Sequence, residues 1–241
     1  MPLDARHGPT VREIDDRASC IVWPTARVLL HWLRTSLKGS VGTELEGSTV
    51  LELGAGTGFL SLGLAEAGVN QVFAVEGDAD AWENLKHNVA ASAEVQAVFW
   101  NWEVHPAVPE EVPLHSVQLI VGSDLVYPRY YSEHALAQVI QSLPGHLPIL
   151  LLLCDRQMPE DASETSPPVR SLDAFLSRCG ELNISFVELP LVLELVEAVL
   201  GTLESGGHDD PGGATGTVSR MRLFRFFGGE TKTLPLYQDE P

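Results

Sequence analysis

The stretch "VLELGAGTGFLSL", residues 50–62, leads from an apolar run into three glycines at alternate positions, Gly54, Gly56 and Gly58. Glycine lacks the Cβ atom that disfavours left-handed backbone conformations and blocks close approach by another group. The spacing therefore predicts a strand that ends in a sharp turn, followed by a helix that begins near Gly58. A tight turn would by itself account for such glycines, but we expect a ligand to approach the backbone here.

The composition limits the classes of function. The chain has 241 residues, enough for one large domain or two small ones, and 33 acidic against 15 basic residues give a formal net charge of −18. Binding nucleic acid through its phosphates requires a surface of Lys and Arg, so the acidic excess argues against a nucleic-acid partner. A basic protein region is a better match, because the acidic surface would steer it toward the chain.

Cysteines and histidines indicate neither a disulfide framework nor a metal site. The three cysteines, Cys20, Cys154 and Cys179, are odd in number and far apart. The eight histidines include no pair at metal-ligand spacing beside a cysteine or a carboxylate cluster. We therefore expect no metal and a reducing compartment, the cytoplasm, with the nucleus as an alternative.

No membrane segment is predicted. The longest apolar run, "LPILLLLC" at 147–154, is far shorter than the ~20 residues of a membrane helix, so we interpret it as a buried strand. The first 20 residues are polar and lack the apolar segment of a signal peptide. We expect no membrane partner, and a monomer because nothing in the pattern indicates an obligate dimer.

Apolar runs alternate with helical patterns along the chain, which is typical of a mostly parallel sheet covered on both faces. The predicted strands are 49–54, 71–76, 95–100, 117–124, 149–154, 184–190 and 220–227. The predicted helices are 24–37, 58–67, 78–91, 132–142, 168–179 and 191–200. Two stretches poor in apolar residues, 156–168 and 204–216, are predicted to be exposed connections.

Glu76 stands twenty positions after Gly56, at the end of the second predicted strand. A carboxylate there can accept hydrogen bonds from both hydroxyls of a ribose. The glycines follow the pattern G-x-G-x-G and not the dinucleotide fingerprint G-x-G-x-x-G. The pattern therefore favours a nucleoside cofactor without phosphate, such as S-adenosylmethionine, over one that needs a pyrophosphate cradle.

Several motifs together resemble a known family. "VLELGAGTG", "AVEGD" and "VGSDLVY", in this order of elements, resemble class I, seven-strand S-adenosylmethionine-dependent methyltransferases over about residues 20–227. The additional motifs "IVWPTARVLLHWL", "WNWE" and "SDLVY" resemble the methyltransferase-like protein-lysine methyltransferases, methyltransferase family sixteen. This resemblance implies a Rossmann-like sheet with strand order 3-2-1-4-5-7-6 and an antiparallel last strand.

The fold class we predict is thus α/β, with helices on both faces of that sheet and an N-terminal helical extension. We expect one methyltransferase domain, residues 1–241, with the extension at 1–47, the core at 48–227 and a C-terminal tail at 228–241.

The resemblance also implies roles for individual residues. Trp23 would lie over the cofactor, Trp102 would flank the adenine, and Ser123 would close the pocket. Gly54, Ala55 and Gly56 would line the methionine portion, and Glu76 would hold the ribose, although the family often has aspartate at that position. For both tryptophans, packing in the core is the alternative interpretation.

Asp124 and Tyr127 follow the fourth predicted strand in "SDLVY", where one turn could direct both side chains at the transferred methyl. Methyl transfer is an in-line displacement, so the enzyme must align an unprotonated amine and exclude water. We expect Asp124 to orient the amine through a charge-assisted hydrogen bond and Tyr127 to shape the channel. Enzymes that methylate nucleobase amines commonly have N/D-P-P-Y/F here, and this chain has leucine and valine at the two middle positions.

The function predicted from the sequence is S-adenosylmethionine-dependent methylation of a protein substrate, most readily at a lysine ε-amine, with S-adenosylhomocysteine as the second product. Two alternatives stay open. One is a methyltransferase that acts on a small molecule or on arginine or histidine side chains. The other is a non-catalytic module that binds the cofactor and a partner.

Overall fold

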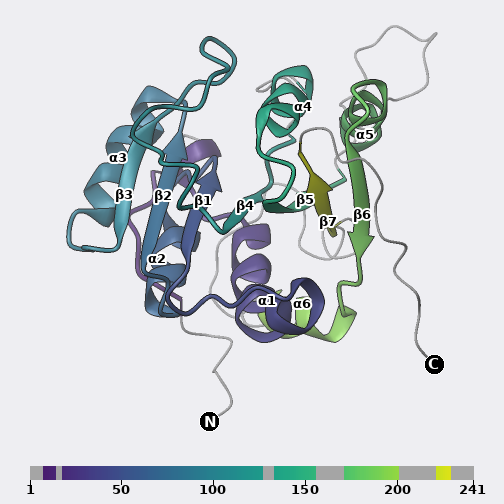
Figure 1. Cartoon of the computed structure of the whole chain (residues 1–241). Helices are drawn as coiled ribbons and strands as arrows, with labels where there is room; N and C mark the ends of the chain where they lie inside the picture. Colours follow the sequence, from purple (N-terminus) through teal and green to yellow (C-terminus); the bar gives the residue numbers. More distant parts are fainter. Residues whose placement is uncertain (1–7, 15–17, 127–132, 156–170, 201–220, 229–241) are drawn as a thin grey trace, which may run out of the picture.

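The computed structural model describes residues 8–14, 18–126, 133–155, 171–200 and 221–228. In this part of the chain seven strands form one sheet, in the order β3-β2-β1-β4-β5-β7-β6 (Figure 1). The strands are β1 (Thr49–Leu53), β2 (Gln71–Glu76), β3 (Val95–Phe99), β4 (Leu119–Ser123), β5 (Pro148–Cys154), β6 (Ser185–Leu189) and β7 (Met221–Phe227). The helices are η1 (Ala18–Cys20), α1 (Pro24–Val41), α2 (Phe59–Glu66), α3 (Ala79–Val89), α4 (Glu133–Ser142), α5 (Ser171–Glu181) and α6 (Leu193–Leu200).

The predicted topology is confirmed. Strands β1 to β5 pair in parallel, with β1 between β2 and β4. Strand β7 runs antiparallel to both of its neighbours, β5 and β6. Because β1 leads to β2 on one side and β4 leads to β5 on the other, the order of the strands reverses between β1 and β4. The carboxyl ends of strands at such a reversal are the usual ligand site of an open α/β sheet.

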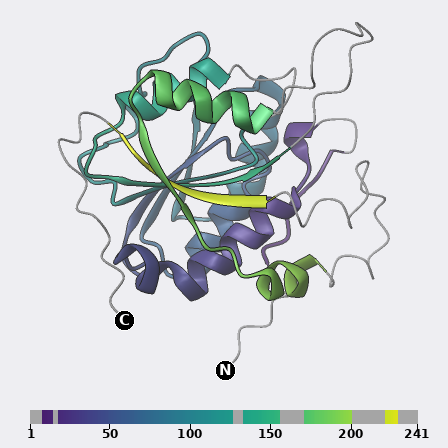
Figure 2. The same ribbon diagram turned by 90° about the vertical axis from the view of Figure 1, so that its right-hand side faces the viewer.

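Helices cover both faces of the sheet, as predicted (Figures 1 and 2). Figure 2 shows α5 above the sheet and α1 and α6 below it. One apolar core joins the strands to α4 and α5, and a second joins the opposite face to α1, α2, α3 and α6. Strand β5, at the junction of the two cores, is buried from Ile149 to Cys154, which explains why its sequence is apolar without interruption.

Differences from the predicted boundaries have local causes. The strand predicted at 117–124 spans only Leu119–Ser123, because the Val117 amide closes a turn on Leu114 and Asp124 has a left-handed backbone. The first helix continues beyond residue 37 to Val41 and ends at Gly42, whose φ of 76° fits a glycine C-cap. The predicted connections at 156–168 and 204–216 lie outside the described residues.

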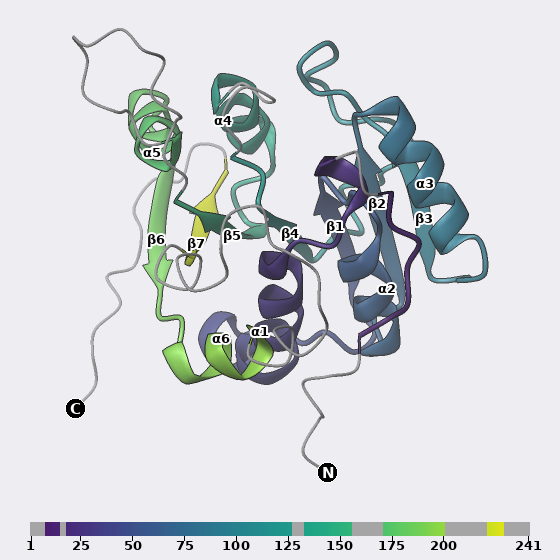
Figure 3. The same ribbon diagram turned by 180° about the vertical axis from the view of Figure 1, so that it is seen from behind.

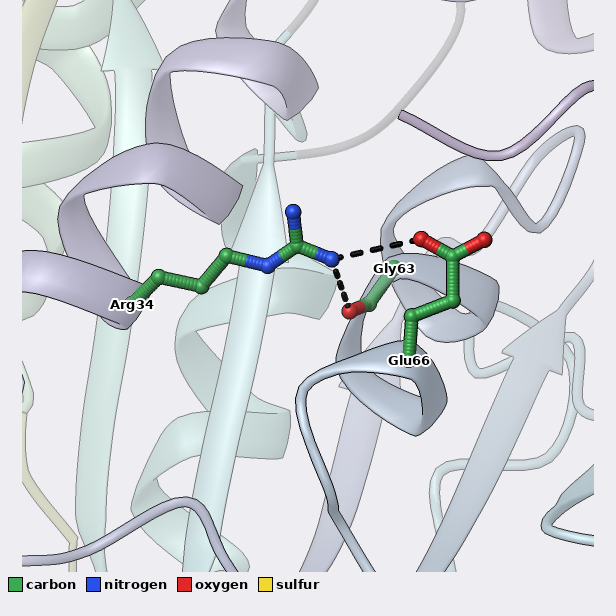
Figure 4. A network of polar contacts seen from close by, with 3 residues as sticks. All are labelled: Arg34, Gly63 and Glu66. Carbon is green, nitrogen blue, oxygen red and sulfur yellow. Dashed lines mark hydrogen bonds and ion pairs between the residues drawn. The ribbon is translucent and has the colours of Figure 1, made fainter. Parts of the chain in front are cut away.

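Helices α1 and α2 pack closely beside the glycine turn. Gly63 of α2 lies against Leu30 of α1, and a Cβ atom at Gly63 would overlap the leucine side chain. Figure 4 shows Arg34 of α1 reaching across to α2, where it donates to the Gly63 carbonyl at 2.7 Å and contacts Glu66 at 3.4 Å. These contacts fix the helix that begins directly after the glycine turn.

Candidate functional site

A cavity of about 430 Å³ lies at the carboxyl ends of β1, β2 and β4, where the strand order reverses. Its volume falls within the range of small-molecule sites, about 300–1,000 Å³. The lining comprises the glycine turn, the start of α2, the ends of β2 and β4, the turn after β3 and the segment before α1. All the predicted site residues that the structure describes line it, namely Trp23, Gly54, Ala55, Gly56, Glu76, Trp102, Ser123 and Asp124.

The glycine turn has the predicted sharp geometry, with left-handed φ angles of 62°, 53° and 79° at Gly54, Gly56 and Gly58. The atoms that a side chain would meet belong to the protein itself. A Cβ at Gly54 would lie 2.5 Å from Leu125, and one at Gly56 would lie 3.0 Å from the Ser19 carbonyl oxygen. Chain contacts and backbone conformation thus require these glycines, as the tight-turn interpretation expects, while the approach of a ligand to this turn stays a prediction.

Glu76 reaches back from the end of β2 to the glycine turn. One carboxylate oxygen accepts the Gly56 amide at 2.9 Å, and the other accepts the amides of Gly77 and Asp78, each at 2.9 Å. Burial raises the pKa of Glu76, while these three donors act in the opposite direction. The carboxylate is thus held rigidly at the edge of the cavity, and its two oxygens keep acceptor capacity for a ligand.

A second buried carboxyl group, Glu52, lines the cavity and was missed by the sequence analysis. It lies within β1, is 2% exposed and accepts a short hydrogen bond from the Ser61 hydroxyl of α2. Burial, with a further contribution from the negative charge of Glu76, raises the pKa of Glu52 to about 8. A charged residue in the otherwise apolar "VLELG" was the signal in the sequence, since such residues are rarely buried without a reason.

The turn after β3 brings tryptophan side chains to the cavity. The Trp100 amide donates to the Glu76 carbonyl at 2.9 Å, which ties this turn to the end of β2. Trp102 is 7% exposed and packs edge-to-face on Trp100, with ring centroids 5.7 Å apart. Trp102 therefore belongs both to the apolar core and to the cavity wall, so the two interpretations of this residue are compatible.

Trp23 lies on another wall of the cavity, at the N-cap of α1 directly before Pro24. Its side chain is half-buried. The sequence analysis also missed Asn101 and Glu103, which line the cavity from the turn after β3. Both residues belong to the motif "WNWE", of which only Trp102 was assigned a role, because their contact with the site depends on tertiary folding.

Ser123 and Asp124 end β4 at the cavity. Asp124 has φ of 55°, one of two left-handed conformations at non-glycine residues in the described chain, and its amide donates to the Leu152 carbonyl at 2.9 Å. Strained backbone of this kind is often kept at functional sites. Tyr127, the other predicted catalytic residue, lies outside the described residues.

The charge of the cavity is one-sided. Its lining includes five acidic residues, and the described lining contains no lysine or arginine. The acidic residues are Glu52, Glu76, Asp78, Glu103 and Asp124. With a pKa of about 8, Glu52 is mostly protonated near pH 7 and adds little to the negative charge of the lining. Such a lining disfavours phosphate groups and favours a ligand that carries positive charge.

Metal ligands and membrane-spanning helices can be assessed for the described residues only. They contain no group of three or more His, Cys, Asp or Glu side chains arranged to hold a metal ion. In the same part of the chain, no helix combines the length and apolar character required to cross a membrane.

A family model described as lysine methyltransferase matches residues 11–165, more than half of the chain. The chain belongs to the lysine methyltransferase family. The matched region includes the glycine turn, Glu76, Trp102 and Asp124, and thus all of the described cavity lining. The family resemblance stated from the motifs is confirmed.

Curated relatives carry related names. Protein N-lysine methyltransferase METTL21A of Mus musculus is 30% identical over 157 residues, which cover 60% of this chain and 64% of that protein. Protein-lysine methyltransferase METTL21E of Bos taurus is 29% identical over 140 residues, 55% of this chain and 46% of the relative. Ribosomal protein L11 methyltransferase of Cupriavidus pinatubonensis is 29% identical over 144 residues, 60% of this chain and 43% of the relative. The chain thus spans less than two thirds of the length of these relatives.

Solved structures share the fold. The glycopeptide N-methyltransferase MtfA, complexed with S-adenosylmethionine, superposes with a TM-score of 0.51 at 14% identity, over 83% of this chain and 93% of that one. The YcgJ protein of Bacillus subtilis gives the same TM-score and identity, over 83% of this chain and 100% of that one. At such identity the likeness concerns architecture alone, and it confirms the predicted Rossmann-like class I methyltransferase fold.

Proposed function

We propose that this protein transfers a methyl group from S-adenosylmethionine to a lysine ε-amine of a protein substrate. The observation that carries the proposal is the acidic cavity at the strand reversal, which the Glu76 carboxylate borders. Membership of the lysine methyltransferase family and the names of the METTL21 relatives support the choice of substrate class.

The chemical groups that line the cavity match those of S-adenosylmethionine. S-adenosylmethionine combines a sulfonium and an ammonium with an uncharged nucleoside, and it contains no phosphate. Its positive groups match the acidic lining, and its ribose hydroxyls match the acceptor capacity left on Glu76. We assign the ribose to Glu76, the adenine to Trp102 and the methionine portion to the Gly54–Gly56 turn, with Trp23 and Ser123 closing the pocket.

The bound cofactor supplies an electrophilic methyl group on sulfur. In the transfer, a nitrogen–carbon bond forms as the sulfur–carbon bond breaks, and the amine nitrogen sheds one proton overall. A lysine amine has a pKa of about 10.4 in water; removal from water lowers this pKa and nearby carboxylates raise it, so the proposed reaction requires that desolvation outweigh the acidic lining. We assign to Asp124 the task of orienting this amine and to Tyr127 that of shaping its channel.

The remaining expectations belong to the same proposal. We propose one methyltransferase domain, with an N-terminal extension at 1–47, a core at 48–227 and a tail at 228–241. Three buried free thiols support a reducing compartment, the cytoplasm or the nucleus. The net charge of −18 supports a basic protein partner rather than nucleic acid. We also propose a monomer without a membrane partner.

Radiolabelled methyl transfer into a cell lysate tests the reaction. The purified chain and S-adenosylmethionine labelled on the methyl group are added, and labelled products are separated and mapped by mass spectrometry. We expect label on lysine ε-nitrogens of one or a few proteins, and none with the matched variant Glu76→Ala. Label confined to small molecules, to nucleic acid, or to arginine or histidine side chains would refute the lysine assignment.

A further inference from the structure

Residues 8–14 are distant from α2 and α3 in the sequence but run along both helices in the folded chain. Figure 3 shows them as the dark purple segment. Gly8 packs directly on the ring of Phe59, the first residue of α2. Val11 packs against the second apolar core. These contacts bring a segment without regular secondary structure to the helices that flank the glycine turn.

Asn88 of α3 recognises the backbone of Arg12 in this segment. Its Oδ1 atom accepts the Arg12 amide at 2.9 Å, and its Nδ2 atom donates to the Arg12 carbonyl at 3.0 Å. The second proton of the same Nδ2 is available for the Thr57 carbonyl, 2.9 Å away in the glycine turn. One side-chain amide thus joins three parts of the chain, which are α3, the N-terminal segment and the glycine turn.

Asn84 lies one turn earlier on the same face of α3. Its Nδ2 atom donates to the Arg12 carbonyl at 3.0 Å, so this carbonyl accepts from both asparagines. Asn84 is 3% exposed, and its Oδ1 atom has no hydrogen-bond partner in the described structure. A buried unpaired oxygen is costly, so the contact to Arg12 is the evident reason for an amide at this position.

The segment continues from Arg12 to the wall of the cofactor cavity. The Ile14 amide donates to the Cys20 carbonyl at 2.9 Å, and the Glu13 carboxylate accepts the Val22 amide at 2.6 Å. Ser19, Ile21, Val22 and Trp23 line the cavity. A shift of the Arg12 backbone would therefore also move the residues that form one wall of the cavity.

We propose that Asn84 and Asn88 are positioning residues that clamp the Arg12 backbone and thereby hold the wall at residues 19–23 and the turn at Thr57 in the shape that binds the cofactor. This inference rests on the proposed cofactor, S-adenosylmethionine. The two asparagines contact the backbone of residue 12 and not its side chain. A substitution at residue 12 should therefore affect the clamp only if it changes the backbone. Neither asparagine lines the cavity, so the clamp would change cofactor affinity only through the lining residues that it holds in place.

Calorimetric titration of full-length variants with S-adenosylmethionine tests the clamp. Asn88→Ala removes three hydrogen bonds. Arg12→Pro removes the backbone N–H that donates to Asn88 Oδ1. We expect each variant to weaken cofactor binding about tenfold. The matched control is Arg12→Ala, which keeps the backbone contacts and is expected to bind within about twofold of the wild type.

Three further readouts separate positioning from a general loss of stability. In the methyl-transfer assay, Asn88→Ala should raise KM for the cofactor with kcat within about threefold of the wild type. The double variant Asn88→Ala with Arg12→Pro should lose less affinity than the two single losses multiplied together, since both variants remove the hydrogen bond from the Arg12 amide to Asn88. Hydrogen exchange without cofactor should be faster at residues 8–14 in Asn88→Ala than in the wild type.

The outcomes distinguish this inference from the proposed function. Wild-type affinity in both Asn88→Ala and Arg12→Pro would overturn the clamp, as would equal losses in Arg12→Pro and Arg12→Ala. A fall in kcat with unchanged KM would also overturn it. A wild-type chain that binds no S-adenosylmethionine would instead refute the cofactor assignment.

Discussion

The ends of β1 and β2 differ from the end of β4, although all three meet at one cavity. At β1 and β2 the site is built mainly from backbone, with three amides directed at the rigid Glu76 carboxylate. At the end of β4 it is lined by Ser123, Asp124 and Leu125, and Asp124 has a left-handed backbone.

We propose that this difference corresponds to two tasks, binding of the cofactor and binding of the acceptor. A cofactor is the same in every reaction cycle, so the fold itself can provide its site through strand ends and a glycine turn. An acceptor differs from one relative to another, so its site depends on side chains and connections that are free to vary. If this division holds, changes at Glu76 should affect cofactor binding and changes at Asp124 should affect transfer.

The largest effect is expected from Glu76→Ala. This variant removes the proposed ribose acceptor and leaves three buried amides without their partner, so S-adenosylmethionine should bind about 100-fold more weakly or worse. Calorimetry measures the loss. The matched variant Glu76→Asp keeps a carboxylate and should retain most of the affinity, whereas equal losses in the two variants would show that the carboxylate itself is not recognised.

A smaller effect, and on a different quantity, is expected from Asp124→Asn. Asparagine also tolerates the left-handed backbone, so the fold should be kept while the charge that orients the amine is lost. We expect kcat to fall about 30-fold with cofactor affinity unchanged, since hydrogen bonds to charged groups contribute about 1.5–3 kcal/mol. Steady-state kinetics with the acceptor, alongside calorimetry, checks both quantities, and unimpaired turnover would refute the proposed role of Asp124 in orienting the amine.

The third prediction concerns folding rather than function: Glu52 should give stability a pH dependence. The pKa of Glu52 is raised from 4.5 to about 8 in the folded chain. Between these values the folded carboxyl holds a proton that the unfolded one has lost, so its contribution to stability is present below about pH 4.5 and declines as the pH rises to about 8. Relative to Glu52→Gln, the wild type should lose about 1 kcal/mol of unfolding free energy per pH unit across this window.

Urea unfolding of the wild type and Glu52→Gln at several pH values measures this difference. Glutamine has a similar volume and can still accept from Ser61, so the comparison isolates the titrating proton. Unfolding free energies that run parallel from pH 5 to 8 would show that Glu52 is ionised in the folded chain throughout.

Most of the fold could be predicted from the sequence because its signals are local. Apolar runs marked the strands, and Asp78, a residue type typical of helix N-caps, caps α3 by accepting the Ala81 amide at 2.8 Å. Glu76, singled out by its spacing from Gly56, lies at the glycine turn and accepts the Gly56 amide, whereas its predicted contact with a ribose stays a prediction. The order of the strands in the sheet was predicted from the family resemblance, because the periodicity of apolar residues does not specify which strands are neighbours.

The parts of the site that escaped prediction depend on tertiary contacts. Asn101 and Glu103 reach the cavity only because the turn after β3 folds back on the end of β2. The requirement for glycine at position 54 comes from Leu125, seventy-one residues later in the chain. The left-handed backbone of Asp124 has no signature in the sequence, since most aspartates adopt ordinary conformations.

The central claim is that the cavity bordered by Glu76 binds the nucleoside of S-adenosylmethionine. A crystal structure of the chain with S-adenosylhomocysteine tests it most directly. The account predicts ribose hydroxyls within hydrogen-bonding distance of the Glu76 carboxylate and the adenine beside Trp102. A nucleoside bound elsewhere, or a ribose held by other residues while Glu76 contacts only its three amides, would contradict it.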